Sequence, residues 1–216
     1  MDNTLFDLVG AQISSCQEVV YLLGMNDGNA LFEYFLRPVR GFESHENILD
    51  YMQDRGIFEN DMFREACSLY ETEKLRAIVP YDGVTSTLQI LQEKGYVMGI
   101  VTDAHSRDAI RRLEKVGLLP FFDTLVTYDM VQVKKPAPEP FLCALGTLKA
   151  GFNETLVVGD SPRRDIEPCR QMGIKTVYAR YGDRFSKMRD YIGADYIIDS
   201  MNQLPDILNR VSAPGA

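Results

Sequence analysis

The sequence is short of the features that mark secreted, metal-clustering and membrane-spanning proteins. It has four cysteines, too few and too scattered for a disulfide framework and without the spacing of metal ligands: Cys16, Cys67, Cys143 and Cys169. No apolar run is long enough to span a membrane, and no basic segment followed by an apolar one marks a secretion signal. We therefore expect a protein of the reducing cytoplasm, without a membrane partner.

Positive charge is also scarce. The 23 Lys and Arg residues stand against 31 Asp and Glu residues, so the formal net charge is −8 at pH 7. This balance argues against general nucleic-acid binding. It does not exclude a phosphorylated small molecule, because a bound cation can reverse the local field. The 216 residues, 45% of them hydrophobic, suit one large domain or a core with a smaller inserted one.

The stretch from Leu156 to Gly173, LVVGDSPRRDIEPCRQMG, is the most informative part of the chain. Its first three residues favour a buried parallel strand, and Gly159 allows a sharp turn after it. Asp160 follows at the strand's carboxyl end, and Asp165 is a candidate N-cap of the next helix, which Gly173 ends. Two carboxylates in a strand-to-helix loop suit Mg²⁺. A turn former and a helix cap explain the same two residues equally well.

The rest of the sequence changes character at Pro80. From Leu8 to about Val79 the apolar periodicity is helical throughout, which predicts a four-helix bundle. From residue 84 onward strand and helix patterns alternate, which predicts βαβ units and a parallel sheet, followed by a loose tail at 213–216. The expected strands are Tyr96 to Val101, Leu125 to Val126, Leu156 to Val158, Thr176 to Ala179 and Tyr196 to Ile198.

Polar residues that suit a phosphoryl group meet at one edge of this sheet. Thr102 ends one strand, Asp160 ends another, and Lys134 and Lys135 lie in the loop between them. Thr102 and nearby backbone N–H groups can donate to phosphate oxygens, and Lys135 can neutralise negative charge. Each residue alone is weak evidence, but their order and shared edge favour phosphate chemistry. The residues that follow Thr102 are expected at a helix start and on its solvent face: His105, Arg107, Arg111 and Arg112.

With these residues in view, the chain resembles the haloacid dehalogenase (HAD) superfamily, most of whose members are magnesium-dependent phosphatases. MDNTLFD resembles the first family motif, DxDxT; VTD at 101–103 resembles the second; KKPAPEPF, with Lys135, the third; and GDSPRRD at 159–165 the fourth. The resemblance implies an α/β core with a Rossmann-like parallel sheet, formed by residues 1–7 and 80–216. Residues 8–79 would be the four-helix-bundle cap inserted after the first motif.

The first motif departs from the family pattern. The family has two Asp residues separated by one residue, the first a nucleophile and the second a general acid/base. Thr4 and Leu5 match only if Asp2 is the second of the pair, so the nucleophile would precede Met1 and the core would lack its first strand. The other register makes Asp2 the nucleophile and puts Thr4 in the acid/base position, which fits less well. A start site assigned one residue too late is the simplest explanation, and a chain that has lost catalysis is the alternative.

The resemblance implies a role for each matched residue. An Asp ahead of Met1 would form an aspartyl-phosphate, and Asp2 would protonate the leaving oxygen and then activate water. Asp2 would also offer its backbone carbonyl to Mg²⁺. Because family dehalogenases lack an Asp in this position, the resemblance favours phosphate monoesters as the substrates of this chain. The catalytic set is then Asp2, Thr102 and Lys135; the phosphate-binding set is Thr102, Asp103 and Lys135; and the metal ligands are Asp2, Asp160 and Asp165.

The expected function is a magnesium-dependent phosphatase of a small phosphorylated metabolite, such as phosphoglycolate, a sugar phosphate or a nucleoside monophosphate. Substrate choice would lie in the cap, where Arg37, Arg40 and His45 either meet a second anionic group or form a solvated helix link. Two alternatives stay open: a phosphomutase of the same family, and a catalytically dead module that binds phosphate or a protein partner. The oligomeric state does not follow from the sequence.

Overall fold

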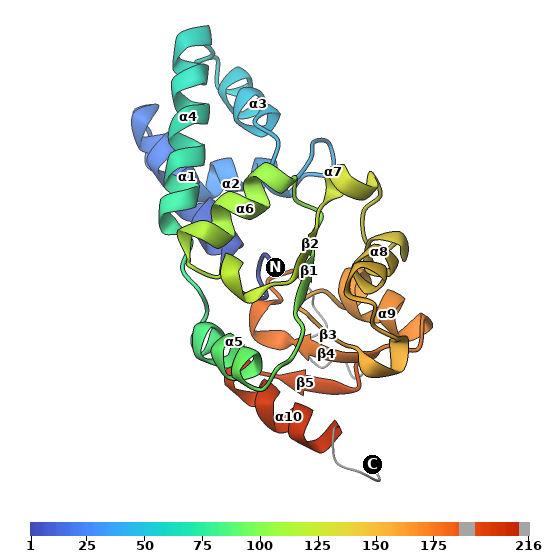
Figure 1. The fold of residues 1–216 in the computed structure, drawn as a ribbon. Helices are drawn as coiled ribbons and strands as arrows, with labels where there is room; N and C mark the ends of the chain where they lie inside the picture. The colour runs from blue at the N-terminus through green and yellow to red at the C-terminus, as the bar shows by residue number, and fades with distance from the viewer. Residues whose placement is uncertain (186–192, 212–216) are drawn as a thin grey trace. The chain divides into compact units, whose positions relative to one another are not determined.

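The computed structural model of the protein describes residues 1–185 and 193–211 (Figure 1). The chain divides into two compact units, one of Met1–Asp7 with Val79–Ala216 and one of Leu8–Ile78. The tail expected at 213–216 lies outside the described residues. Within the described ranges, no helix is long and apolar enough to cross a membrane. Helices and parallel strands together confirm the predicted α/β class.

The Leu8–Ile78 unit contains four helices, which follow the apolar periodicity of the sequence: α1 (Leu8–Leu22), α2 (Gly28–Leu36), α3 (Glu46–Asp54) and α4 (Asn60–Ala77). Helix α1 packs against α4 and α2. The Asp27 side chain caps α2 by accepting a hydrogen bond from the Ala30 backbone N–H. In the centre the rings of Phe35 and Tyr70 stack with centroids 4.9 Å apart, and both residues are buried. Apolar packing therefore holds this unit together.

A buried ion-pair network lies within the same unit. The Lys74 side chain is only 4% exposed, and its Nζ lies 2.9 Å from Glu71 Oε1 and 3.4 Å from Glu43 Oε2. His45 Nε2 lies 2.8 Å from the same oxygen of Glu71. Burial alone would raise the pKa of Glu71, but the hydrogen bond to His45 and the charge of Lys74 outweigh it and lower that pKa to about 2. The ionised Glu71 side chain therefore stabilises the folded unit.

The other unit carries the strands and their connecting helices. Its main elements are α5 (Val84–Glu93), β1 (Gly99–Val101), α6 (Ser106–Lys115), β2 (Thr124–Val126), α7 (Tyr128–Val131), α8 (Glu139–Leu148), β3 (Leu156–Gly159), α9 (Glu167–Gln171), β4 (Lys175–Ala179), β5 (Tyr196–Ile198) and α10 (Leu204–Val211). A short π-helical turn, Pro162–Ile166, connects β3 to α9. Strand and helix alternate as the sequence predicts.

Within the part of the chain that the structure describes, five strands form two parallel sheets. In one, β1 pairs with β2, and Ile100 lies opposite Leu125. In the other, the order is β3–β4–β5, and Val158 lies opposite Val177. Helix α8 contacts both sheets, because the apolar cluster that contains its residue Phe141 also includes residues of β1 and β3. Apolar packing thus connects the two sheets where backbone hydrogen bonds do not.

The first expected strand is shorter than the sequence suggests. The apolar run from Tyr96 to Val101 predicts a strand of that length, but β1 begins at Gly99. Before Gly99 the backbone is held by a side chain: the N–H of Met98 donates to Asp123 Oδ2 at 2.9 Å. Asp123 also donates its own N–H to the Met98 carbonyl at 2.7 Å. These contacts hold the backbone of Met98 beside Asp123 without extending β1, so the apolar run alone overestimates the strand.

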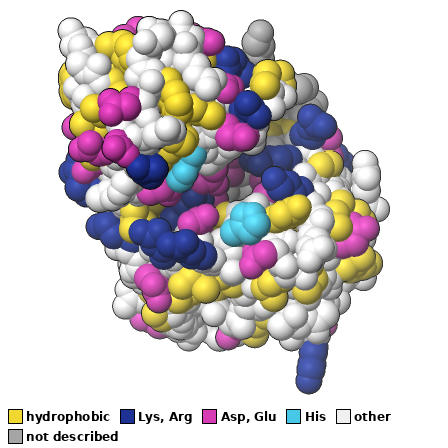
Figure 2. Space-filling view, turned by 90° about the horizontal axis from the view of Figure 1, so that it is seen from above, with side chains coloured by type: hydrophobic (Ala, Val, Ile, Leu, Met, Phe, Trp, Pro, Cys, Tyr) yellow, Lys and Arg dark blue, Asp and Glu magenta, His cyan; other side chains and the backbone are white. Residues whose placement is uncertain are grey.

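Charged side chains of both signs are mixed at the surface. Figure 2 shows a face on which Lys and Arg side chains lie among Asp and Glu side chains, with apolar patches between them. The net charge of the whole chain is −8.

The network around Lys74 generates a stability prediction. Replacing Glu71 by Gln should lower the free energy of unfolding at pH 7 by about 1–3 kcal/mol, because it removes the partner of a buried ammonium ion. The native pKa of Glu71 is depressed from 4.5 to about 2. Its stabilisation is therefore present above pH 4.5 and lost as the pH falls toward 2. Urea unfolding followed by circular dichroism, repeated from pH 3 to pH 7, measures the effect.

Glu46→Gln is the matched control for this experiment. Glu46 pairs with Arg40 at 3.2 Å, but 57% of its side chain is exposed. Its replacement should therefore change the free energy of unfolding by less than about 0.5 kcal/mol. A loss in Glu71→Gln of the same size at pH 3 and pH 7 would mean that packing, not charge, is responsible.

Candidate active site

Thr102 lies immediately after β1, and the loop that follows turns around it. Its backbone N–H donates to the Val126 carbonyl of the neighbouring strand at 2.9 Å. Its Oγ1 accepts a hydrogen bond from the Ala104 backbone N–H at 3.2 Å, and the residue is 6% exposed. Because Oγ1 is the acceptor in that bond, the Thr102 O–H is the part of the group that can donate to a ligand.

Lys135 connects the ends of both sheets. Its Nζ lies 2.6 Å from Asp165 Oδ1 and 3.4 Å from the Val101 carbonyl oxygen, and its backbone N–H donates to Asp103 Oδ1 at 3.0 Å. Burial alone would lower the pKa of Lys135, but the charges of Asp165 and Asp103 raise it above its usual value. The side chain is therefore a fixed ammonium ion at neutral pH.

Asp160 and Asp165 form a pair of buried carboxylates beyond β3. Asp160 Oδ1 accepts a hydrogen bond from Thr4 Oγ1 at 2.6 Å, and Asp165 Oδ2 accepts one from the Ser161 N–H at 3.0 Å. Burial and the negative charge of Asp165 raise the pKa of Asp160 to about 6. Burial also acts to raise the pKa of Asp165, but the charge of Lys135 lowers it below its usual value. One lysine is thus shared by two acids.

The prediction that Asp165 caps the next helix is wrong. Ser161 takes that role, because its Oγ accepts a hydrogen bond from the Arg164 N–H at the start of the π-helical turn. Asp165 lies inside the turn and points back to β3 instead. A Cβ atom at Gly159 would lie 2.4 Å from the Cβ of Asp165. The glycine therefore lets the Asp165 side chain pack against the end of the strand.

Asp2 lies in an N-terminal loop that is tied to α6. Its Oδ1 lies 3.1 Å from Arg112 Nη1, and the Arg112 side chain is 3% exposed. The prediction that Arg112 lies on the solvent face of its helix is therefore wrong. On the other side of the loop, the Tyr181 hydroxyl donates to the Thr4 carbonyl at 2.6 Å. A Cβ at Gly182 would lie 1.6 Å from the Asn3 carbonyl oxygen, so only glycine allows this approach.

The structure thus brings most, but not all, of the predicted site residues together. Lys135 contacts both Asp165 and Asp103, Thr4 contacts Asp160, and the charge of Asp165 acts on Asp160; Thr102 follows at the end of β1. The Asp2 carboxylate instead contacts Arg112. Among the described residues, no group of three or more Asp, Glu, His or Cys side chains is arranged to hold a metal ion. Asp160 and Asp165 together offer two carboxylates to a cation.

The three candidate specificity residues of the helical unit contact acidic side chains of that same unit. Arg37 Nη2 lies 3.0 Å from Asp50 Oδ2, and Arg40 Nη2 lies 3.3 Å from Asp50 Oδ1. His45 contacts Glu71 at 2.8 Å. These partners give all three side chains a structural role, which matches the interpretation of the segment as a helix link.

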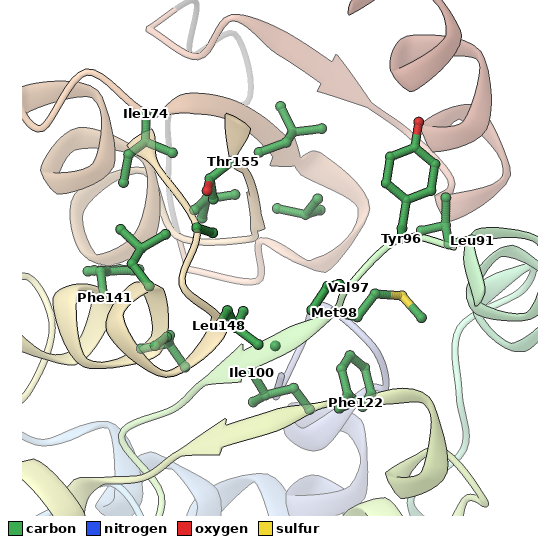
Figure 3. Close-up of a pocket in the computed structure, with 18 of the residues that line it drawn as sticks. Leu91, Tyr96, Val97, Met98, Ile100, Phe122, Phe141, Leu148, Thr155 and Ile174 are labelled. Atoms are coloured by element: carbon green, nitrogen blue, oxygen red, sulfur yellow. The ribbon is translucent and has the colours of Figure 1, made fainter. Parts of the chain in front are cut away.

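A cavity of about 530 Å³ lies in the strand-bearing unit, between β1 and β3. Figure 3 shows apolar side chains around this space, with Phe141, Leu148 and Ile174 on one side and Leu91 and Tyr96 on the other. The polar end of the cavity is formed by Met1, Thr4, Lys135 and Asp165. The cavity therefore meets the cluster of candidate catalytic residues at one end; the rest of its lining is mostly apolar, with polar side chains at Lys149, Glu154 and Thr155.

Arg112, Ser161, Tyr181 and Gly182 are the residues of this site that the sequence does not single out. Arg112 occupies a helix in a basic run, and its partner lies 110 residues away. Tyr181 contacts a residue 177 positions away. Ser161 has a usable local signal, since a Ser that directly precedes Pro162 is a recognised N-cap pattern.

Known proteins share both the sequence and the fold of this chain. The family model described as haloacid dehalogenase-like hydrolase matches residues 1–179. Pyrophosphatase PpaX of Halalkalibacterium halodurans is 36% identical over 62% of this chain, but the match spans only 61% of that protein. The glyceraldehyde 3-phosphate phosphatase of Methanocaldococcus jannaschii is 31% identical over 72% of this chain and 68% of its own length.

A solved structure agrees with these relatives. The crystal structure of a HAD phosphatase from Thermococcus onnurineus superimposes with a TM-score of 0.65 at 25% identity, over 96% of this chain and 94% of that one. The family model covers far more than half of the sequence, including all four motifs. The family suggested by the motifs is therefore confirmed, and the chain belongs to the haloacid dehalogenase-like hydrolases.

Proposed function

We propose that the protein is a phosphatase of a small phosphorylated metabolite. The observation that carries this proposal is the buried ammonium of Lys135, which joins the end of β1 to Asp165 beyond β3. Thr102 directly follows Val101, whose carbonyl Lys135 contacts, and its buried hydroxyl can donate to a ligand. Fixed donors and a fixed positive charge at one edge of a parallel sheet suit the oxygens of a transferring phosphoryl group. The phosphatase and pyrophosphatase names of the relatives support the same reaction class.

In this proposal Lys135 and Thr102 bind the phosphate. Lys135 would stabilise the negative charge that builds up on the phosphoryl oxygens, and its contacts with Asp103 and Asp165 keep it in place. Thr102 would donate its O–H to another of those oxygens. Asp103 would act through its backbone, because its side chain already holds the Lys135 N–H.

The residues beyond β3 fit a divalent cation such as Mg²⁺. Asp160 and Asp165 are both buried, and the charge of Asp165 contributes to the raised pKa of Asp160. A bound cation would remove this repulsion, and carboxylate oxygens are the ligands that Mg²⁺ prefers. We assign Asp160 and Asp165 as side-chain ligands and the backbone carbonyl of Asp2 as a third. When bound, the ion would neutralise charge on the phosphoryl group.

The position of Asp2 supports the register in which it is the general acid/base. A nucleophile would need its carboxylate beside Asp160, but the Asp2 carboxylate pairs with Arg112, and Thr4 is the loop residue that contacts Asp160. Asp2 would protonate the leaving oxygen and later take a proton from water. The attacking carboxylate would then come from a residue ahead of Met1.

Compartment and substrate belong to the same proposal. All four cysteines are free, which supports a reducing compartment such as the cytoplasm. A phosphate monoester of a small metabolite fits a site whose recognised donors are one ammonium and one hydroxyl. No described residue favours a phosphomutase over this function.

Asp160→Asn tests the cation site in a chain extended to complete the first motif. We expect Mg²⁺-dependent hydrolysis of a generic aryl phosphate to fall at least about 100-fold, because one of two ligand carboxylates is lost. Mg²⁺ should raise the Tm of the parent but not of the variant. Asp206→Asn, which alters an exposed residue of α10, is the control and should behave like the parent. Parent-like rates and Mg²⁺ response in Asp160→Asn would refute the assignment.

The raised pKa of Asp160 predicts a pH effect in the absence of Mg²⁺. Its folded-state pKa of about 6 exceeds its ordinary value of 3.8, so its ionisation disfavours the folded state. Stability from this group is complete below about pH 4 and is lost as the pH rises through 6, by up to about 3 kcal/mol. In EDTA, Asp160→Asn should therefore be more stable than the parent at pH 7.5 and equal to it at pH 4. Parallel stability curves for the two proteins would contradict this.

A further inference from the structure

We propose that Arg164 is a substrate-binding residue, which recognises a second anionic group beside the phosphoryl group of the substrate. This inference rests on the proposed function, in which Lys135 binds the phosphate, and it names the class of substrate. A suitable substrate carries a carboxylate or a second phosphate close to the ester oxygen. Arg164, Lys135 and Asp103, which contacts both, all belong to the strand-bearing unit.

The Asp103 side chain places the two cationic residues next to each other. Its Oδ1 accepts the Lys135 backbone N–H at 3.0 Å, and its Oδ2 lies 3.6 Å from Arg164 Nη1. Burial and the charges that Lys135 and Asp165 exert on each other are the largest influences on the pKa values of these two groups, and the positive charge of Arg164 also acts to lower both. Arg164 therefore lies within electrostatic reach of the Lys135 ammonium and of a proposed cation ligand.

Solvent exposure increases along this row of side chains. The Lys135 side chain is 10% exposed, that of Asp103 is 19% exposed and that of Arg164 is 49% exposed. The buried end suits a reacting phosphoryl group, which is protected from water there. The rest of the substrate would extend toward solvent, and Arg164 lies at that end of the row.

The guanidinium group of Arg164 has N–H donors to offer. Its distance of 3.6 Å from Asp103 is too long for a hydrogen bond, and its Nε donates to Ser161 Oγ at 3.5 Å, the upper limit of the usual range. Arg180, by contrast, donates from Nε and Nη2 to Asp199 at 2.7 and 2.6 Å. A planar guanidinium can bind a carboxylate or phosphate in the same bidentate way. Among the described residues, none provides such an acceptor for Arg164.

The backbone of Arg164 is fixed, so its side chain extends from a defined position. Arg164 lies within the π-helical turn, and its N–H donates to Ser161 Oγ at 3.3 Å. The next residue, Asp165, is buried and contacts Lys135 at 2.6 Å. The same short turn therefore carries a proposed cation ligand and a half-exposed guanidinium side by side.

The arginines expected to select the substrate are less available than Arg164. In the helical unit, Arg37 Nη2 donates to Asp50 Oδ2 at 3.0 Å, and Arg40 Nη2 donates to Asp50 Oδ1 at 3.3 Å. An anionic group that binds either arginine would compete with these hydrogen bonds. At Arg164 it would compete with no hydrogen bond from Asp103, so the energy of the new pair is retained more fully.

The experiment measures the Kd of three probes for residues 1–216 by calorimetry at saturating Mg²⁺. Methylphosphonate has one anionic group, phosphonoacetate adds a carboxylate, and methylenediphosphonate adds a second phosphonate. In Arg164→Gln we expect the Kd of at least one of the two larger probes to rise at least about tenfold, the effect of one charge-assisted pair. The Kd of methylphosphonate should change less than about threefold. Chelation of Mg²⁺ in solution is the same for every variant and cancels in this comparison.

Arg163→Gln is the matched control, because it removes the same charge from an exposed neighbour in the same turn. It should leave all three Kd values as in the parent, and both variants should keep the parent Tm. A rise for phosphonoacetate alone would identify the second group as a carboxylate, and a rise for methylenediphosphonate alone would identify it as a phosphate. Either result supports the proposal.

Three results would overturn the role of Arg164 while leaving the proposed function intact. They are unchanged Kd values in Arg164→Gln, an equal rise for all three probes, and an equal rise in Arg163→Gln. The second would make Arg164 a residue that only positions Asp103 and Lys135. A parent that binds none of the probes, or methylphosphonate binding that survives in Lys135→Met, would instead refute the proposed function and this inference with it.

Discussion

The shared charge of Lys135 is the interaction on which the rest of the site depends. Two carboxylates, Asp160 and Asp165, are buried at the end of β3, where like charges repel strongly. The Lys135 ammonium contacts Asp165 directly and supplies the charge that keeps it ionised. The surrounding backbone accommodates this arrangement, because Gly159 admits Asp165 against the strand. In the proposed function the same lysine also binds the phosphate, so one interaction would serve both folding and ligand binding.

The sequence predicts those parts of the site that depend on local order along the chain. Thr102 and Asp160 follow apolar runs, and parallel strands end at one edge, so their proximity can be predicted without a structure. Arg112 could not be found this way, because helical periodicity does not reveal an acid 110 residues away. The sequence cannot distinguish Asp165 from Ser161 as a cap, because Asp and Ser carry the same capping signal and only the π-helical turn decides between them.

Long-range polar pairs account for most of what the sequence could not reveal. In the helical unit the apolar spacing predicts the four helices, yet Lys74, with its charged side chain, is 4% exposed. Its burial is tolerated because Glu71 and Glu43 converge on it from positions three and 31 residues away. Charge in a sequence normally indicates solvent exposure. The burial of a charged side chain therefore cannot be predicted from the sequence before its partners in the fold are known. This holds for Lys74 in this unit and for Arg112.

Lys135, in the candidate catalytic cluster, also bridges the ends of the two sheets. Its Nζ contacts the Val101 carbonyl of β1 and the Asp165 carboxylate beyond β3, so it bridges the polar end of the cavity. Phe141 of α8 packs with residues of both sheets at the apolar side. One polar and one apolar contact thus connect the two sheets. The proposed phosphate-binding and cation-binding groups are therefore positioned by the same residues that join the two sheets, so the packing between the sheets and the geometry of the candidate site form a single constraint.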